Sequence, residues 1–146
     1  MFEKTYAIII LFLAGMITPD EYNSCLDKIF LENPENDLLT DLEFASNDFD
    51  ETRSIINEYI LKTKLNIDYS VFGSALFEKI SEVYNNNIMD IEFFGRKAYS
   101  IWQLLPHEIS AKEPFWTLSY ADDCLSYGDE KQTRKLCEET FSYKWN

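Results

Sequence analysis

Carboxylates are the side chains of this sequence best placed to do chemistry. Twelve Asp and Glu residues fall between Thr18 and Glu58, where only Lys28 and Arg53 oppose them, so this stretch carries a formal charge of −10. The whole chain has 26 acids, 13 bases and a net charge of −13. A cluster of this kind can be a solvated face, a cation site or a docking surface for a basic partner.

Residues 48–52 read Asp-x-Asp-x-Thr and resemble the opening of a calcium-binding loop. Such a loop needs a glycine at its sixth position and an acid that binds the ion at its twelfth. Arg53 and Tyr59 stand at these two positions, so the calcium loop is excluded. His107 is the only histidine, and the cysteines lack the spacing of a metal site. We therefore expect no metal and no cofactor.

His107 is also the only imidazole base, and Glu108 follows it. Nucleophilic catalysis would require pairing this base with a thiol of Cys25, Cys124 or Cys137. The sequence has no Gly-x-Ser-x-Gly turn and no glycine-rich loop followed by Lys and Ser or Thr. We expect a protein that is not an enzyme, with a Cys–His pair as the enzymatic alternative and a connector or helix-capping role for His107.

Some of the acids have a local explanation, because the helix dipole favours negative charge in a first turn. Asp37 and Asp41 differ, since like charges four residues apart on a helix repel each other. Local stability therefore does not require so many acids, and both a solvated face and a docking surface remain open. The candidate docking residues are Asp37, Asp41, Glu43, Asp48, Asp50, Glu51 and Glu58.

A second candidate surface lies on a helix that we expect from Glu113 to Tyr127. Its members are spaced i, i+4, i+7 and i+11, which puts them on one helical stripe, while Phe115, Leu118 and Leu125 can face the core. Tyr and Trp often anchor protein interfaces, although they are equally common in cores. The residues of this stripe are Trp116, Tyr120, Asp123 and Tyr127.

Helices must position these groups, because apolar residues recur at helical spacing along the whole chain. Capping residues predict where helices begin, namely after Thr18, Asn33, Asp48, Asp90 and Asp129. Gly15, Asn85–Asn87, Pro106 and Gly128 predict interruptions or ends. The sequence therefore predicts an all-α fold, with residues 1–146 forming a single compact domain of about seven helices.

The composition excludes several classes of protein. Hydrophobic residues make up 46% and aromatic residues 16%, which is incompatible with intrinsic disorder. The acidity argues against direct binding of nucleic acid or of an anionic membrane surface. The apolar run Tyr6–Ala14 is too short to span a bilayer, and it lacks a basic leader and a small-x-small cleavage site. We expect a buried first helix and, from the odd number of cysteines, a cytoplasmic protein.

Residues 11–22, LFLAGMITPDEY, join an apolar first helix to a capped acidic second helix, and residues 33–37, NPEND, open the next. In this respect the chain resembles the immunity proteins of bacterial contact-dependent growth inhibition and related polymorphic toxin systems, over residues 6–60. The resemblance implies a one-to-one complex with the toxin domain of the same locus, in the cytoplasm of the producing cell.

A basic nuclease toxin, an RNase or a DNase, suits the acidity of the chain, because a nuclease is basic where it meets phosphate. The sequence therefore favours an immunity protein that neutralises its toxin through an acidic surface. The alternative is a helical adaptor or regulatory subunit whose basic protein partner is not a toxin.

Overall fold

The computed structural model describes residues 1–86 and 90–145 of the chain, and these residues are helical with no strand. The α-helices are α1 (Phe2–Leu13), α2 (Pro19–Glu32), α3 (Asp37–Phe44), α4 (Phe49–Thr63), α5 (Tyr69–Asn86), α6 (Ile91–Leu104), α7 (His107–Ser110) and α8 (Glu130–Phe141). Two 3-10 helices, η1 (Phe115–Ser119) and η2 (Asp123–Tyr127), lie between α7 and α8. The prediction of an all-α fold is confirmed, with more helices in the described residues than the seven expected.

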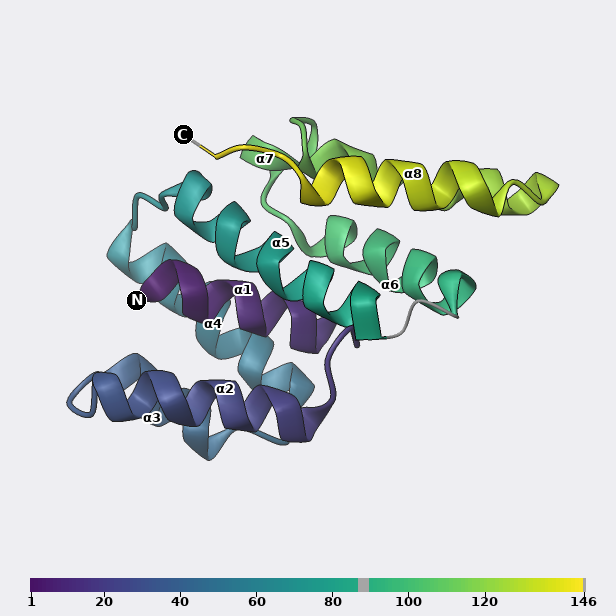
Figure 1. Ribbon diagram of the computed structural model, residues 1–146. Helices are drawn as coiled ribbons and strands as arrows, with labels where there is room; N and C mark the ends of the chain where they lie inside the picture. The colour runs from purple at the N-terminus through teal and green to yellow at the C-terminus, as the bar shows by residue number, and fades with distance from the viewer. Residues whose placement is uncertain (87–89, 146) are drawn as a thin grey trace.

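Helix α1 forms the centre of the molecule. It packs against α5, α2, α4 and α6, and Figure 1 shows it between α5 and α2. Ile9 and Leu11 are fully buried, as are almost all the side chains of this helix. Burying an aliphatic side chain contributes about 1.5–3 kcal/mol, so this apolar run stabilises the core on all sides. The prediction of a buried first helix is confirmed.

Side-chain caps fix most of the helix starts where the sequence predicts them. Thr18 accepts a hydrogen bond from the backbone N–H of Glu21 at 3.1 Å, and Asp48 accepts one from that of Glu51 at 3.1 Å. Asp90 and Asp129 cap α6 and α8 in the same way. Each such cap is worth about 1 kcal/mol.

The predicted start at Asn33 is wrong. Asn33 ends α2, and its backbone N–H donates to the carbonyl groups of Ile29 and Phe30. The cap of α3 is Asn36, whose side chain accepts from the backbone N–H of Leu39 at 3.1 Å. The predicted interruption at Asn85–Asn87 is also displaced, because α5 includes Asn86; Asn87 itself lies outside the described residues.

The expected helix from Glu113 to Tyr127 is wrong as well, because the chain forms η1 and η2 there instead of one α-helix. The buried residues of this segment explain the difference. Phe115, Leu118, Ala121 and Cys124 are buried at intervals of three residues, which is the repeat of a 3-10 helix rather than an α-helix. Gly128 ends the segment as predicted, with the positive φ of 82° that glycine tolerates.

In Figure 1 the helices are stacked in layers from the bottom of the view to the top. Helices α2 and α3 lie at one end, α8 lies at the other, and α1, α5 and α6 lie between them. The acidic helices α2 and α3 therefore lie at the opposite end of the molecule from α8 (Figure 1). None of the helices in the described residues has both the length and the apolar character that a membrane span requires.

Candidate functional site

The second half of the acidic stretch folds as two helices that turn back on each other, α3 and α4. Leu39 and Leu42 of α3 and Ile56 of α4 are buried in the common core. The connection is held by buried Thr52, whose hydroxyl donates to the carbonyl of Ala45 at 3.1 Å. Because the apolar faces point inward, the opposite faces of both helices meet solvent side by side.

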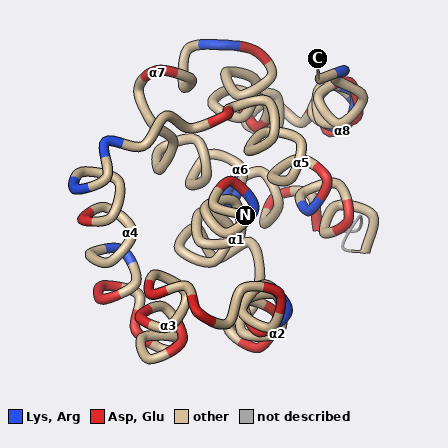
Figure 2. Tube along the Cα trace, turned by 90° about the vertical axis from the view of Figure 1, so that its left-hand side faces the viewer, with Lys and Arg blue, Asp and Glu red and all other residues tan. Residues whose placement is uncertain are grey.

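A groove of about 510 Å³ runs between these outer faces. Four of the seven predicted docking acids line it, together with two larger apolar side chains and one alanine. We call this feature the acidic groove; its residues are Asp41, Phe44, Ala45, Asp48, Glu51, Ile55 and Glu58. Figure 2 shows the acidic residues of α3 next to those at the adjoining end of α4.

Phe44 is the residue of the acidic groove that the sequence analysis missed. Its side chain is 89% exposed, although burial of its ring would stabilise the fold by about 1.5–3 kcal/mol. The sequence contains a sign of this exposure. Leu38, Leu42 and Ala45 define the buried face of α3, and Phe44 does not lie on that face. An aromatic residue at a position that the period predicts to be solvent-exposed indicates a contact surface.

The carboxylates of the groove differ in how far they are compensated. Glu58 pairs with Lys62 at 3.0 Å, and both side chains are well exposed. Asp48 uses one oxygen to cap α4. The side chains of Asp41 and Glu51 make no hydrogen bond and no ion pair within the described residues. These two carboxylates are therefore free to bind a cationic group.

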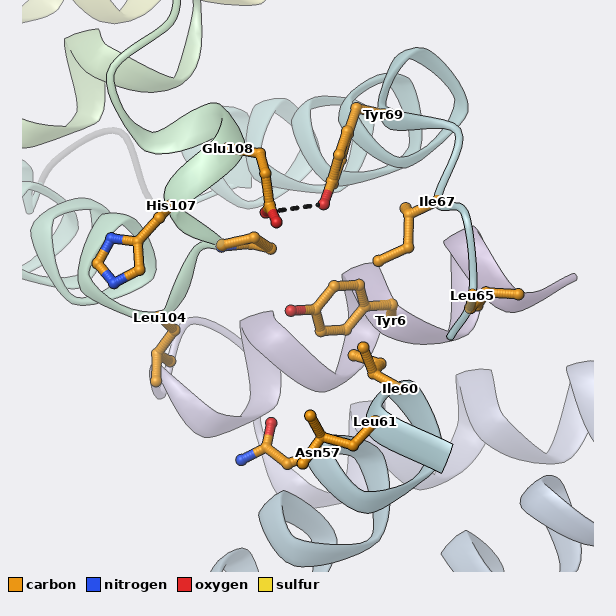
Figure 3. Close-up of a pocket in the computed structure, with 11 residues that line it drawn as sticks. Tyr6, Asn57, Ile60, Leu61, Leu65, Ile67, Tyr69, Leu104, His107 and Glu108 are labelled. Carbon is orange, nitrogen blue, oxygen red and sulfur yellow. Dashed lines mark hydrogen bonds between the residues drawn. The ribbon is translucent and has the colours of Figure 1, made fainter. Parts of the chain in front are cut away.

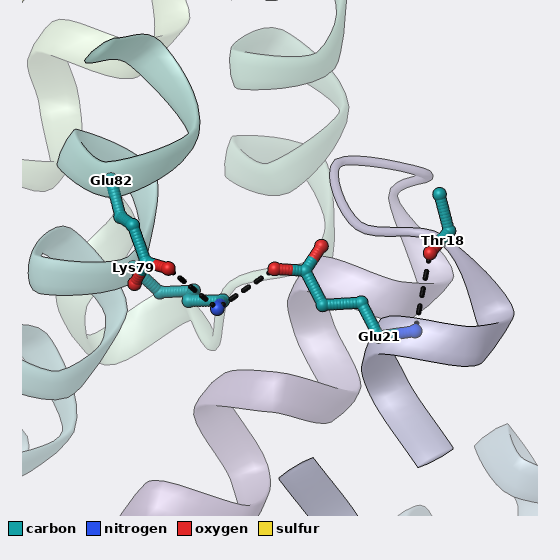
Figure 4. Close-up of polar contacts among 4 residues, drawn as sticks. All are labelled: Thr18, Glu21, Lys79 and Glu82. Atoms are coloured by element: carbon teal, nitrogen blue, oxygen red, sulfur yellow. Dashed lines mark hydrogen bonds and ion pairs between the residues drawn. The ribbon is translucent and has the colours of Figure 1, made fainter. Parts of the chain in front are cut away.

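Glu21 of α2 is compensated by an ion pair with another helix. Lys79 of α5 reaches across to Glu21 at 2.8 Å and to Glu82 of its own helix at 3.3 Å (Figure 4). The lysine is largely buried, so this pair is screened less than an exposed one. The charge of Glu21 is thus compensated by Lys79, unlike that of Asp41 and Glu51 in the groove.

Glu43 faces away from the acidic groove, toward α2. Burial, followed by the hydrogen bond and negative charge of Asp27, raises the pKa of Glu43 to about 7. Burial also raises the pKa of the nearby Tyr22 hydroxyl, with a further contribution from Glu43. Glu43 is therefore a half-buried carboxyl group whose charged form is disfavoured by burial and by its neighbour Asp27, in contrast to the outward acids of the same helix.

Asp37 and Asp50 are exposed but do not line the groove. Both lie in the first turn of a helix, α3 and α4 respectively. The helix dipole stabilises a carboxylate there by about 0.3–1 kcal/mol, which gives each of them a local reason to be acidic.

The aromatic residues predicted to form a stripe do not form one, because the α-helix that would align them is absent. Trp116 is 42% exposed and packs edge-on against Trp102 at 5.8 Å between ring centres. Tyr120 is half-buried, and Asp123 begins η2 in solvent. Tyr127 is exposed and donates a hydrogen bond to the sulfur of Cys124 at 3.3 Å. Trp116 lies on η1, Asp123 and Tyr127 lie on η2, and Tyr120 directly follows η1, all far along the chain from the acidic groove.

The structure pairs His107 with no cysteine among the described residues, and no cysteine lines the hollow that His107 borders. Burial raises the pKa of Cys137 to about 12, so its thiol stays protonated at neutral pH. Across residues 1–86 and 90–145, no three His, Cys, Asp or Glu side chains come together as metal ligands.

The acidic groove is thus the place where predicted residues converge, and its chemistry is that of binding: carboxylates beside an exposed aromatic ring. Comparison with known proteins adds no assignment to this geometry. No protein-family model, no curated protein and no solved structure matches the chain.

Proposed function

We propose that this protein binds and neutralises a basic toxin domain, most directly a nuclease, by presenting the acidic groove to it. One observation carries the proposal: Asp41, Glu51 and the exposed ring of Phe44 share one groove. The resemblance of residues 6–60 to immunity proteins of polymorphic toxin systems gives the class of partner.

Charge supports this proposal through the rate of association. An acidic surface attracts a basic one before contact, and such steering raises association rates by factors of about 10–10³. Asp41 and Glu51 have no ion pair among the described residues to break on binding, so a partner's Lys or Arg gains their full attraction. Phe44 supplies the apolar contact that charge alone does not give, as aromatic anchors do in other interfaces.

Co-expression tests the proposal with the toxin domain encoded next to this gene as the probe. We expect expression of this chain to restore growth of cells that make the toxin domain, and the two proteins to elute together on a sizing column. Failure of both would contradict the proposal. A stable complex without restored growth would also contradict it. Failure of both would favour the alternative, a helical adaptor or regulatory subunit whose basic partner is not a toxin.

A pair of charge variants separates the groove from bulk charge. Asp41→Asn with Glu51→Gln neutralises two groove acids, whereas Asp50→Asn with Glu35→Gln neutralises two exposed acids outside it. Both variants change the net charge equally. We expect the groove variant to lower the association rate with the toxin domain by about tenfold and the control by less than about twofold. Equal effects would remove the groove from the mechanism.

A further inference from the structure

A second hollow lies on the other side of α4, bounded by α1, the start of α5 and the α6–α7 turn (Figure 3). Its volume is about 600 Å³, within the range of about 300–1,000 Å³ that small-molecule sites occupy. Most of its walls are hydrocarbon, provided by Ile60, Leu61, Leu65, Ile67, Leu104 and Pro106. We call it the tyrosine pocket after Tyr6 and Tyr69, which line it together with Asn57, His107 and Glu108.

The polar groups of the tyrosine pocket converge on Glu108. The hydroxyl of Tyr69 donates to Oε2 of Glu108 at 3.2 Å, as the dashed line in Figure 3 marks. Glu108 is the only Asp, Glu, Lys or Arg side chain that lines the pocket. Its other oxygen makes no hydrogen bond within the described residues. The carboxylate, which is exposed to solvent, therefore keeps an open acceptor beside the aliphatic walls of the hollow.

Tyr6 gives an independent sign that the tyrosine pocket is built for a ligand. Its side chain is only 6% exposed, yet its hydroxyl points into the cavity in Figure 3. That hydroxyl has no hydrogen-bond partner in the described part of the chain. The hydroxyl therefore keeps its donor and its acceptor capacity available to a ligand in the pocket.

The charges around the pocket determine which ligand charge it favours. Burial, followed by the neighbouring Tyr69 and then by the negative charge of Glu108, raises the pKa of Tyr6 to about 12. Burial and Glu108 do the same for Tyr69, whose pKa is also about 12. Both phenols therefore stay neutral at physiological pH, and Glu108 provides the formal negative charge. Such a site attracts a cation and repels an anion.

We propose that the tyrosine pocket binds a small organic cation, an amidine or amine carried on an aryl or alkyl body. The N–H groups of the cation donate to the open oxygen of Glu108 and to the hydroxyl oxygen of Tyr6. The hydrocarbon body of the ligand packs against the aliphatic walls. A volume of about 600 Å³ is more than one side chain of a protein partner would fill, which favours a free small molecule.

Benzamidine is the probe for this proposal, and benzamide is its neutral counterpart of nearly the same shape. We expect titration followed by NMR to show saturable shifts of the Tyr6 and Tyr69 ring signals with benzamidine. Binding of benzamide should be at least about tenfold weaker. No saturable binding of benzamidine, or equal binding of the two probes, would overturn the proposal.

Three variants locate the binding energy. Glu108→Gln keeps an acceptor for Tyr69 but removes the charge, and should weaken benzamidine by about tenfold while leaving benzamide unchanged. Glu78→Gln removes the same charge from an exposed position on α5 outside the pocket, and should change neither. Tyr6→Phe should weaken benzamidine by about threefold. Unchanged benzamidine binding in Glu108→Gln would contradict the assignment.

A fourth variant covers the case in which Glu108→Gln or Tyr6→Phe fails to fold. Asn57 is exposed on α4 and lines the pocket, so Asn57→Trp fills the hollow without disturbing the core. We expect it to abolish benzamidine binding at an unchanged midpoint of thermal unfolding. Retained binding would place the ligand elsewhere and overturn the proposal. No step of this test involves the acidic groove, so its outcome is independent of toxin binding.

Discussion

Helix α4 separates two hollows that differ in how they hold negative charge. On one side, Asp48, Glu51 and Glu58 face solvent in the acidic groove. On the other, the exposed carboxylate of Glu108 accepts from Tyr69 at a hollow with hydrocarbon walls. A cluster of carboxylates attracts a basic partner over a Debye length and is therefore screened by salt, whereas a single carboxylate in contact with a small ligand depends less on salt. The same helix can therefore serve a protein partner and a small ligand by different physics.

Salt gives the largest expected difference between the two hollows. Raising ionic strength from about 0.01 M to about 1 M shortens the Debye length from about 30 Å to about 3 Å. We expect the association rate with the toxin domain to fall by about 10- to 100-fold across this range, measured by stopped flow. Benzamidine affinity should change much less, by about threefold, because it depends on one charge pair at contact distance rather than on long-range attraction. An association rate independent of salt would contradict the role of the acidic groove in attracting the toxin domain.

Removal of the Phe44 ring is expected to have the next largest effect. Phe44→Ala should raise the Kd of the toxin complex by about tenfold, mainly through faster dissociation. Because the ring is 89% exposed, the free energy of unfolding should stay within about 0.5 kcal/mol of the original. Leu31→Ala is the matched control, since Leu31 is 76% exposed on α2 outside the groove. Surface plasmon resonance and urea denaturation separate the two effects, and equal Kd changes in both variants would contradict the role of Phe44.

Sequence periodicity predicts the groove only within one helix. Positions 48, 51, 55 and 58 are spaced by three or four residues, so one face of α4 follows from the chain alone. Asp41 joins that face only because the connection after α3 folds back, and the buried bond from Thr52 to Ala45 that fixes it is a tertiary contact. Glu43 shows what acidity alone does not predict. It lies two residues beyond Asp41, on the side of α3 that faces α2 rather than on the groove.

The fold shows the same division between local and tertiary causes. Thr18 and Asp48 mark helix starts because a cap is a contact across three residues, which the sequence contains in full. The 3-10 helices within residues 113–127 could have been predicted from the sequence, because the three-residue spacing of Phe115, Leu118 and Ala121 is visible there. No local sequence pattern predicts the tyrosine pocket, because α1, α4, α5 and the α6–α7 turn all contribute to it.

Glu43 is a third kind of carboxyl group, which is half-buried and lies next to another acid, Asp27. Its pKa of about 7 in the folded protein exceeds the ordinary value of 4.5. The folded state therefore holds the proton more tightly, and the stability that this gives is complete below about pH 4.5 and is lost as pH rises through 7. Glu43→Gln, which stays neutral, should be more stable than the original protein at pH 8 by the order of 1 kcal/mol, a value reduced by solvent screening.

Urea denaturation at pH 4.5 and pH 8 measures this effect. We expect the two proteins to be equally stable at pH 4.5 and to differ at pH 8. Glu35→Gln is the control, because Glu35 is exposed in the α2–α3 connection; it should give the same difference from the original at both pH values. A Glu43→Gln difference that does not depend on pH would show that Glu43 carries its charge as freely as the groove acids do.

The smallest expected effect concerns Lys62, the one cation paired with a groove acid among the described residues. Lys62→Ala breaks its 3.0 Å contact with Glu58, but both side chains are well exposed, so the free energy of unfolding should change by less than about 0.5 kcal/mol. Releasing Glu58 makes the groove more negative, and the association rate at low salt should rise by about twofold. Lys135→Ala removes the same charge and breaks a similar pair with Glu139 on α8, at the other end of the molecule. If that variant accelerated association equally, net charge rather than the groove would attract the partner; acceleration by Lys62→Ala alone would assign the attraction to the open carboxylates of α4.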